Sequence, residues 1–346
     1  MGSVRRARSV AVLGVVIVAL AGCTAVPARD GAAVAEEAAP TREAKARQVF
    51  ADFQTANNKA NKEISDALIS AIETGPVLEA DLASYKNIRA GRDAPVREFF
   101  YEDPVFHVPE GDGDPAWFMV DAAAAEDLRK GLLFVREDDG YKLRNTVYFG
   151  PGGMPELARA GGGAAPTAVP ALDAARLSRE HAALLNDPNR ADGDVPGHFV
   201  PGDHTTRFFL DYCLGEAHRQ FTGYGFTGGC HWRERTDDPD FALRTADGRA
   251  LVWYSVALTD SYRRGANKDT GFDRVYLPGW YNPFVPVDKE TYSYSTEGSD
   301  ESFLRHFYKD GYTGEAVVQF AALVTPDGDS IDVIAHNRHP LAASGS

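Results

Sequence analysis

Cysteine, long apolar runs and catalytic motifs are scarce in this chain, and each scarcity excludes a class of protein. Only three of the 346 residues are cysteine, and they form no C-x-x-C pair, which disfavours a structural zinc site. The chain has no G-x-S-x-G segment and no Gly-rich loop followed by Lys-Ser or Lys-Thr. It therefore lacks the usual sequence signs of a serine hydrolase and of a P-loop nucleotide-binding protein.

Basic charge is in deficit as well. The chain carries 36 Lys and Arg against 50 Asp and Glu, a formal net charge of −14 at pH 7. An acidic surface repels phosphate groups, so nucleic acid is not expected as a partner. Hydrophobic residues make up 44% of the sequence, which is enough for a sizeable core, and the length suggests two domains.

The first 23 residues follow the order of an export signal. Arg5, Arg6 and Arg8 are basic, and the apolar run Val10–Leu20 after them is shorter than the roughly 20 residues that span a membrane. The segment Leu20-Ala21-Gly22-Cys23 then resembles the bacterial lipobox. In that family the cysteine thiol receives a lipid group, with acyl chains such as palmitate, and a peptidase cuts before the cysteine.

The lipobox resemblance implies a cellular location as well as a modification. It makes residues 1–22 a lipoprotein signal peptide and Cys23 the lipidation site, and it anchors the protein at the extracytoplasmic face of the cell membrane. The alternatives are an ordinary signal peptide, or an uncleaved anchor in which the cysteine stands by chance.

Composition divides the remainder of the chain into four parts. Residues 23–40 are small, polar and interrupted by proline, and we expect a flexible tether. Residues 41–149 form a predicted N-terminal α+β domain, and residues 150–171 a predicted linker rich in Gly, Ala and Pro. Residues 172–340 form a predicted C-terminal α+β domain.

The two remaining cysteines, Cys213 and Cys230, both belong to the exported part of the chain. Disulfides persist outside the cytoplasm, so an even number of cysteines there predicts one bridge between them. The alternatives are two separate buried thiols, or a metal site that also uses His218 and His231.

Helices are expected where apolar residues recur at steps of three and four. This pattern predicts a helix over residues 41–74 that begins at the N-cap Thr41, has a kink at residues 57–62 and stops at Gly75-Pro76. A shorter helix is expected around residues 79–87, and another over residues 172–186.

Strands are expected on both sides of an Asp-Gly step that lies between two apolar runs, because such a step is typical of tight hairpin turns. The steps at residues 139–140, 247–248 and 327–328 lie in this setting. The runs Ala250–Asp260 and Ala316–Thr325 are apolar at nearly every position, so we expect central strands that are covered on both faces.

Helices followed by hairpins in each half predict the α+β class, in which two domains each pack one or more helices on a curved antiparallel sheet. This plan looks like the NTF2-like or cystatin-like fold. The layout as a whole resembles uncharacterised lipoproteins of high-GC Gram-positive bacteria such as Streptomyces that carry a domain of unknown function. The resemblance brings no catalytic residues with it.

Ionisable side chains suggest two candidate acid–base sites. NTF2-like folds are cone-shaped, and some of them place an Asp/His pair in the mouth of the cone as general acid and base. One consists of Asp103, His107 and Asp121. The other consists of Asp332 and His336, which are four residues apart on a predicted strand and should face the same side.

Histidine spacing predicts no metal site. His198 and His204 are six residues apart, and His336 and His339 are three apart, but neither pair has the spacing of a known ligand motif. We therefore expect no metal and no cofactor.

The segment Tyr276–Tyr312 is unusually rich in aromatic residues. Exposed aromatic side chains stack on sugars and peptides, so the segment is a candidate binding surface, although the same side chains would equally suit a crossover packed on the core. The surface residues we select are Tyr276, Trp280, Tyr281, Phe284, Tyr292 and Tyr294.

These features favour a non-enzymatic lipoprotein that binds an envelope protein, a cell-wall polymer or a small ligand. One alternative is a secreted hydrolase or isomerase with an acid–base pocket in an NTF2-like domain. Another is a structural role in assembly.

Overall fold

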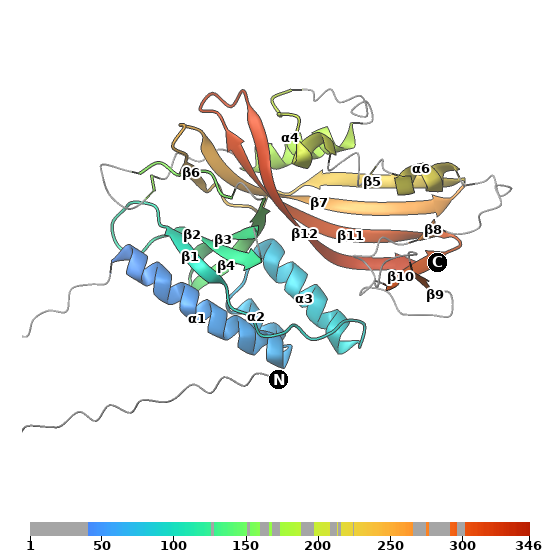
Figure 1. Ribbon diagram of the computed structural model, residues 1–346, viewed down its shortest axis with the longest axis horizontal. Helices are drawn as coiled ribbons and strands as arrows, with labels where there is room; N and C mark the ends of the chain where they lie inside the picture. Colours follow the sequence, from blue (N-terminus) through green and yellow to red (C-terminus); the bar gives the residue numbers. More distant parts are fainter. Residues whose placement is uncertain are drawn as a thin grey trace, which may run out of the picture. The chain divides into compact units, whose positions relative to one another are not determined.

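The computed structural model describes residues 41–125, 128–150, 153–159, 166–167, 174–187, 197–207, 213, 216–223, 225–265, 275–276, 291–295 and 302–346 (Figure 1). Side chains between residues 266 and 307 lie outside this description. Residues Pro40–Ser346 form one compact unit of helices and a large antiparallel sheet. The predicted α+β class is therefore confirmed.

The first helices begin where expected but divide the segment differently. Helix α1 (Arg42–Glu63) starts at Thr41, whose hydroxyl accepts a hydrogen bond from the backbone N–H of Ala44. It ends at Ile64, which takes a left-handed conformation with φ +49°. Ser65 then caps the short helix α2 (Asp66–Ser70). The predicted single helix over 41–74 is therefore wrong, since it is broken at Ile64, beyond the kink expected at residues 57–62.

Gly75-Pro76 begins a helix instead of ending one. Helix α3 (Gly75–Arg89) has Pro76 in its first turn, where the missing proline N–H costs nothing because that position has no partner within a helix. Thr74 also donates its backbone N–H to Leu143 of the sheet. This contact fixes the start of α3 against the sheet.

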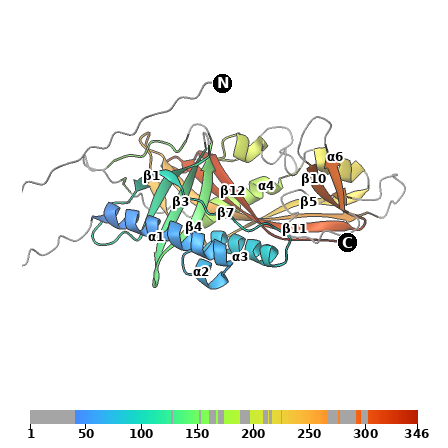
Figure 2. The ribbon, with the colours of Figure 1, turned by 60° about the horizontal axis from the view of Figure 1, so that its bottom comes forward.

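The first four strands form an antiparallel meander: β1 (Glu102–His107), β2 (Trp117–Ala125), β3 (Leu128–Glu137) and β4 (Gly140–Phe149). The predicted Asp-Gly hairpin is confirmed, because Glu137 pairs with Gly140 at the turn between β3 and β4. Helix α1 packs on this meander (Figure 2) through Phe50 and Phe53, which contact Phe134.

The second half contributes the longest strands. Helix α4 (Ala174–Asn186), the π-helical turn η2 (Asp203–Arg207) and helix α6 (Glu216–Gly223) all come before them. The strands are β5 (Phe226–Glu234), β6 (Ala242–Arg244), β7 (Ala250–Arg264), β11 (Gly311–Val324) and β12 (Ile331–Gly345). A separate three-stranded sheet consists of β8 (Val275–Tyr276), β10 (Ser302–Tyr308) and β9 (Thr291–Ser295).

Both halves belong to one nine-stranded sheet with the order β1-β2-β3-β4-β12-β11-β7-β5, in which β6 also pairs with β7. The junction is the pairing of β4 with β12, where Phe149 lies opposite Ala335 and Tyr148 opposite His336. Where the sequence suggested a separate sheet in each half, the structure has one curved, unclosed sheet that both halves share. The domain boundaries at residues 149 and 172 stay a prediction.

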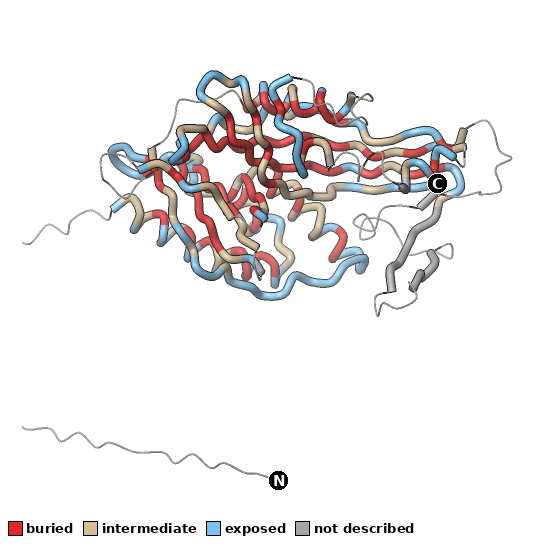
Figure 3. The backbone as a smooth tube through the Cα atoms, turned by 45° about the horizontal axis from the view of Figure 1, so that its top comes forward, coloured by how far each residue is buried: buried red, intermediate tan, exposed pale blue. Residues whose placement is uncertain are grey.

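The central strands are covered on both faces, as their composition predicted (Figure 3). Val252 and Tyr254 of β7 pack with Leu177 of α4 on one face. Leu251 and Trp253 pack on the other face, which we call the inner face. Their partners there come from the first half and include Trp117, Met119, Leu133, Val147 and Phe149. The meander β1–β4 therefore lies between α1 and the inner face of the long strands.

Gln319 of β11 connects the halves by hydrogen bonds. Its side chain is fully buried. The amide Nε2 donates to the backbone oxygen of Arg144 at 3.0 Å, and Oε1 accepts from the backbone N–H of Thr146 at 3.0 Å. The Gln319 side chain thus supplies hydrogen-bond partners to backbone groups of β4 in the part of that strand that does not pair with β12.

Candidate ligand-binding pocket at the fork between β4 and β12

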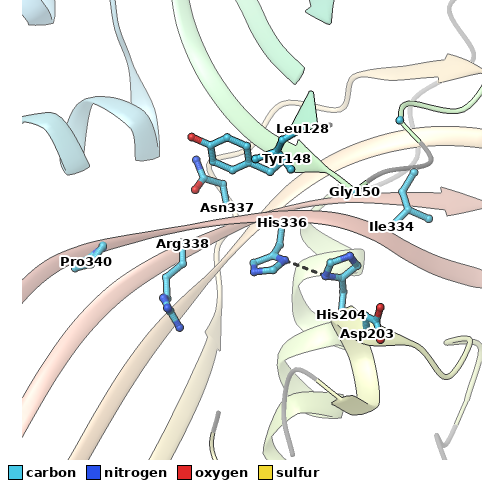
Figure 4. A pocket seen from close by; sticks show the side chains of 11 residues that line it. Leu128, Tyr148, Gly150, Asp203, His204, Ile334, His336, Asn337, Arg338 and Pro340 are labelled. Carbon is cyan, nitrogen blue, oxygen red and sulfur yellow. Dashed lines mark hydrogen bonds between the residues drawn. The ribbon is translucent and has the colours of Figure 1, made fainter. Parts of the chain in front are cut away.

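A cavity of about 650 Å³ opens where β4 and β12 separate. We call it the fork pocket (Figure 4). β4 pairs with β12 at only two positions, so the strands diverge beyond His336 and leave space at the edge of β12. The residues that line the pocket are Leu128, Tyr148, Gly150, Gly153, Asp203, His204, Ile334, His336, Asn337, Arg338 and Pro340.

The turn η2 reaches the fork pocket because the chain before it joins the sheet. Phe199 forms a parallel bridge with Ile331 at the start of β12. Val200 donates its N–H to the Ile331 carbonyl, and Ile331 donates to the carbonyl of His198. Phe199 is buried beside the ring of His181. These contacts fix the segment from which η2 carries His204 to β12.

His204 and His336 face each other across the fork pocket, with their Nδ1 atoms 2.9 Å apart (Figure 4). One of these nitrogens must donate and the other accept for a hydrogen bond to form. Burial lowers the pKa of His336 to about 4, assisted by His204 and Arg338, and burial also lowers the pKa of His204. Both imidazoles are therefore neutral at pH 7.

Asp332 and His336 do not form the predicted pair. The register of β12 shifts between the partners of Ala321 and Ala322, which marks a β-bulge at Ile334. Asp332 consequently lies opposite Leu323 of the inner face, whereas His336 lies opposite Phe320 of the other face. The expectation that both face the same side is wrong because the bulge interrupts the strand alternation. Asp332 instead lies 3.7 Å from Arg249.

The first-half residues are brought together only in part. His107 and Asp121 line one cavity of about 470 Å³ on the outer strands of the meander. Asp121 forms a salt bridge with Arg129, in which Oδ1 lies 2.8 Å from Nε, although burial still raises the pKa of this carboxyl. Burial lowers the pKa of His107 to about 4. Asp103 is exposed, and its backbone oxygen accepts a bond from Arg129.

A buried polar cluster also exists that sequence patterns did not reveal. Glu73 and Asp81 lie close together, burial raises the pKa of both carboxyls, and the charge of Asp81 raises the pKa of Glu73 further. Lys130 lies near them and donates to the hydroxyl of Tyr101 at 3.2 Å. Its ammonium also lies 5.1 Å from the ring centre of Tyr148, which lines the fork pocket.

The cysteine prediction is confirmed where the structure describes it. Cys213 and Cys230 form a disulfide, with their Cα atoms 5.4 Å apart. Cys23 lies outside the described residues. Of the proposed aromatic surface, Trp280, Tyr281 and Phe284 also lie outside them, as do the side chains of Tyr276, Tyr292 and Tyr294. That surface stays a prediction.

The described part of the chain contains neither a candidate membrane-spanning helix nor a metal-binding cluster of side chains. None of its helices is long and apolar enough to cross a membrane. Among the same residues, no three or more His, Cys, Asp or Glu side chains gather as a set that could hold a metal ion.

Comparison with known proteins yields a family but no activity. Residues 38–273 match the model of the family described as Domain of unknown function (DUF8094). Neither the curated proteins nor the solved structures contain a match to this chain.

Proposed function

This chain belongs to the DUF8094 family, and we propose that it is a protein lipid-anchored at the extracytoplasmic face of the cell membrane that binds a ligand without transforming it. The order of residues in the first 23 positions carries the anchoring half of this proposal. Three arginines, an apolar run and Leu20-Ala21-Gly22-Cys23 follow one another in the order of a lipoprotein signal. Two acyl chains bury enough methylene groups for stable attachment, whereas one chain attaches only reversibly.

The fork pocket carries the binding half. Its volume of about 650 Å³ lies within the usual range for small-ligand sites, and its polar side chains come from β4, β12 and η2. We propose that the group bound in this pocket is a small ligand or a part of an envelope protein or cell-wall polymer. The aromatic segment around Tyr276–Tyr294 remains a second proposed contact surface.

Binding without catalysis is favoured because the acid–base pairs expected from the sequence are engaged in other contacts. Asp121 is held by Arg129, and Asp332 lies on the opposite face of the sheet from His336. A general acid and base must reach the same substrate atoms. The hydrolase or isomerase alternative therefore loses its best pair.

The anchor is tested by substituting Cys23→Ser and separating membranes from soluble contents. We expect the native chain to incorporate labelled palmitate and sediment with membranes, and C23S to incorporate none and retain its signal peptide or appear in the soluble fraction. Ser9→Ala is the matched control, since it removes a polar atom in the same signal without removing the acceptor thiol. Unlabelled native protein in the cytosol would contradict the proposal.

A further inference from the structure

We propose that His204 and His336 bind a divalent transition-metal ion in the fork pocket, with both Nδ1 atoms as ligands. This inference rests on the proposed binding function of that pocket and deepens it by naming a ligand class. It does not depend on the lipid anchor. The two histidines are 132 residues apart in the chain, so no local spacing motif could reveal them.

The two nitrogens lie within reach of one ion. Metal–imidazole bonds are about 2.0–2.1 Å long, so nitrogens 2.9 Å apart can hold a common ion once each ring turns its lone pair away from the other nitrogen and towards the metal. Nitrogen ligands bind Ni²⁺ and Cu²⁺ more tightly than Mn²⁺, Fe²⁺ or Co²⁺. Ni²⁺ and Cu²⁺ are therefore the ions that this pair favours.

The protonation of the pair suits a metal. The hydrogen bond between the two Nδ1 atoms requires one of them to present its lone pair already. In the metal-free pair one Nδ1 carries the proton of the shared hydrogen bond. When the metal binds, that proton moves to Nε2 of the same ring, so each Nδ1 gains a free lone pair and no proton leaves the protein.

The surroundings of the pair orient and charge the site. The backbone of Ile334 hydrogen-bonds the His204 ring, as backbone groups commonly do for metal-bound histidines. Asp203, the chain neighbour of His204, lines the same pocket and adds a negative charge that favours a cation. Arg338 opposes a cation but lines the same pocket, and it would attract an anionic group bound to the metal.

The rest of the coordination belongs to water or to the ligand. No third protein ligand joins the two histidines within the described ranges. A two-histidine site leaves several positions open. The fork pocket would thus hold a metal ion that an anionic donor group of a ligand can complete.

The test is calorimetric titration of the detergent-solubilised, tag-free full chain with NiCl₂ and with CuCl₂ at pH 7.5. We expect one saturable ion per chain, and an affinity at least about tenfold weaker in His204→Gln and in His336→Gln, since even the loss of a second-shell partner costs 10–100-fold. His198→Gln is the matched control, because His198 lies on the same segment but half-exposed beside Asp329. H198Q should bind like the native chain.

A second measurement needs no variant. The electron paramagnetic resonance spectrum of one equivalent of Cu²⁺ on the native chain should show splitting from two imidazole nitrogens. Absence of saturable binding, one nitrogen in the spectrum, or native affinity in the folded H204Q protein would overturn the metal site. The Cys23→Ser fractionation reports on the anchor alone, so failure of one proposal leaves the other separately measurable.

Discussion

At the scale of single residues, the sequence could not predict how burial changes the pKa of an ionisable side chain. Asp260 of β7 is only 4% exposed, and its carboxylate accepts a hydrogen bond of 3.0 Å from the hydroxyl of Tyr312. Burial nevertheless outweighs this bond and raises the pKa of Asp260 to about 6, from 3.8 in an exposed aspartate. The folded protein therefore holds this proton more tightly than the unfolded chain.

The linkage has a definite sign and predicts the effect of Asp260→Asn. The stability contributed by protonated Asp260 is fully present below pH 3.8 and is lost as the pH rises through about 6. Asparagine keeps an acceptor for Tyr312 but does not titrate. Relative to the native chain, D260N should gain up to about 3 kcal/mol in free energy of unfolding between pH 4 and pH 7.

Denaturant unfolding at both pH values measures this gain. Asp138→Asn serves as the control, because Asp138 is an exposed turn residue. A difference between D260N and the native chain that does not change with pH would contradict the linkage.

At the scale of single elements, glycines set how closely strands approach. Gly311 begins β11 with φ +135° and lies opposite Arg263 of β7. A Cβ atom at this position would overlap the carbonyl oxygen of Tyr262, which belongs to the backbone and cannot rotate away. Glycine is required there both for its φ angle and for the close approach of β7.

Gly311→Ala should therefore destabilise the chain by about 3 kcal/mol or more, because β11 and β7 must separate locally. Gly248→Ala is the matched control: Gly248 has φ +90° in the turn before β7, but its Cβ would meet nothing within 4 Å. The control should cost only about 1–2 kcal/mol for its backbone conformation. If G311A and G248A lost the same free energy of unfolding in thermal or denaturant experiments, the close approach of β7 to Gly311 would not contribute to stability.

On the scale of the whole molecule, the halves share a core as well as a sheet. Leu251 and Trp253 of the second half pack with Met119 and Val147 of the first half on the inner face. Gln319 adds hydrogen bonds to the backbone of β4. Neither half can bury this surface without the other.

We expect residues 41–346 to unfold in one cooperative transition, monitored by far-UV and near-UV circular dichroism. Gln319→Leu should lower the free energy of unfolding by about 2–4 kcal/mol, since it leaves the buried amide of Thr146 and carbonyl of Arg144 without partners. Gln48→Leu, an exposed glutamine on α1, is the control. Two separate transitions in the native chain would show that the halves are energetically independent.

The sequence alone determined the features that depend on neighbouring residues. The cap at Thr41, the Asp-Gly hairpins, the α4 helix and the two-sided burial of β7 and β11 were all predictable, because local patterns govern them. The disulfide was predictable because only two cysteines remained to pair. The order of residues 1–23 is likewise local information, and the anchor proposal rests on it.

Only the tertiary structure decided what depends on distant residues. The pairing of β4 with β12 brings together segments almost two hundred residues apart, and no periodic pattern encodes it. The bulge at Ile334 separated Asp332 from His336, and the Phe199–Ile331 bridge brought His204 to His336. The fork pocket exists because two strands paired at just two positions before diverging, and long-range packing alone sets that register.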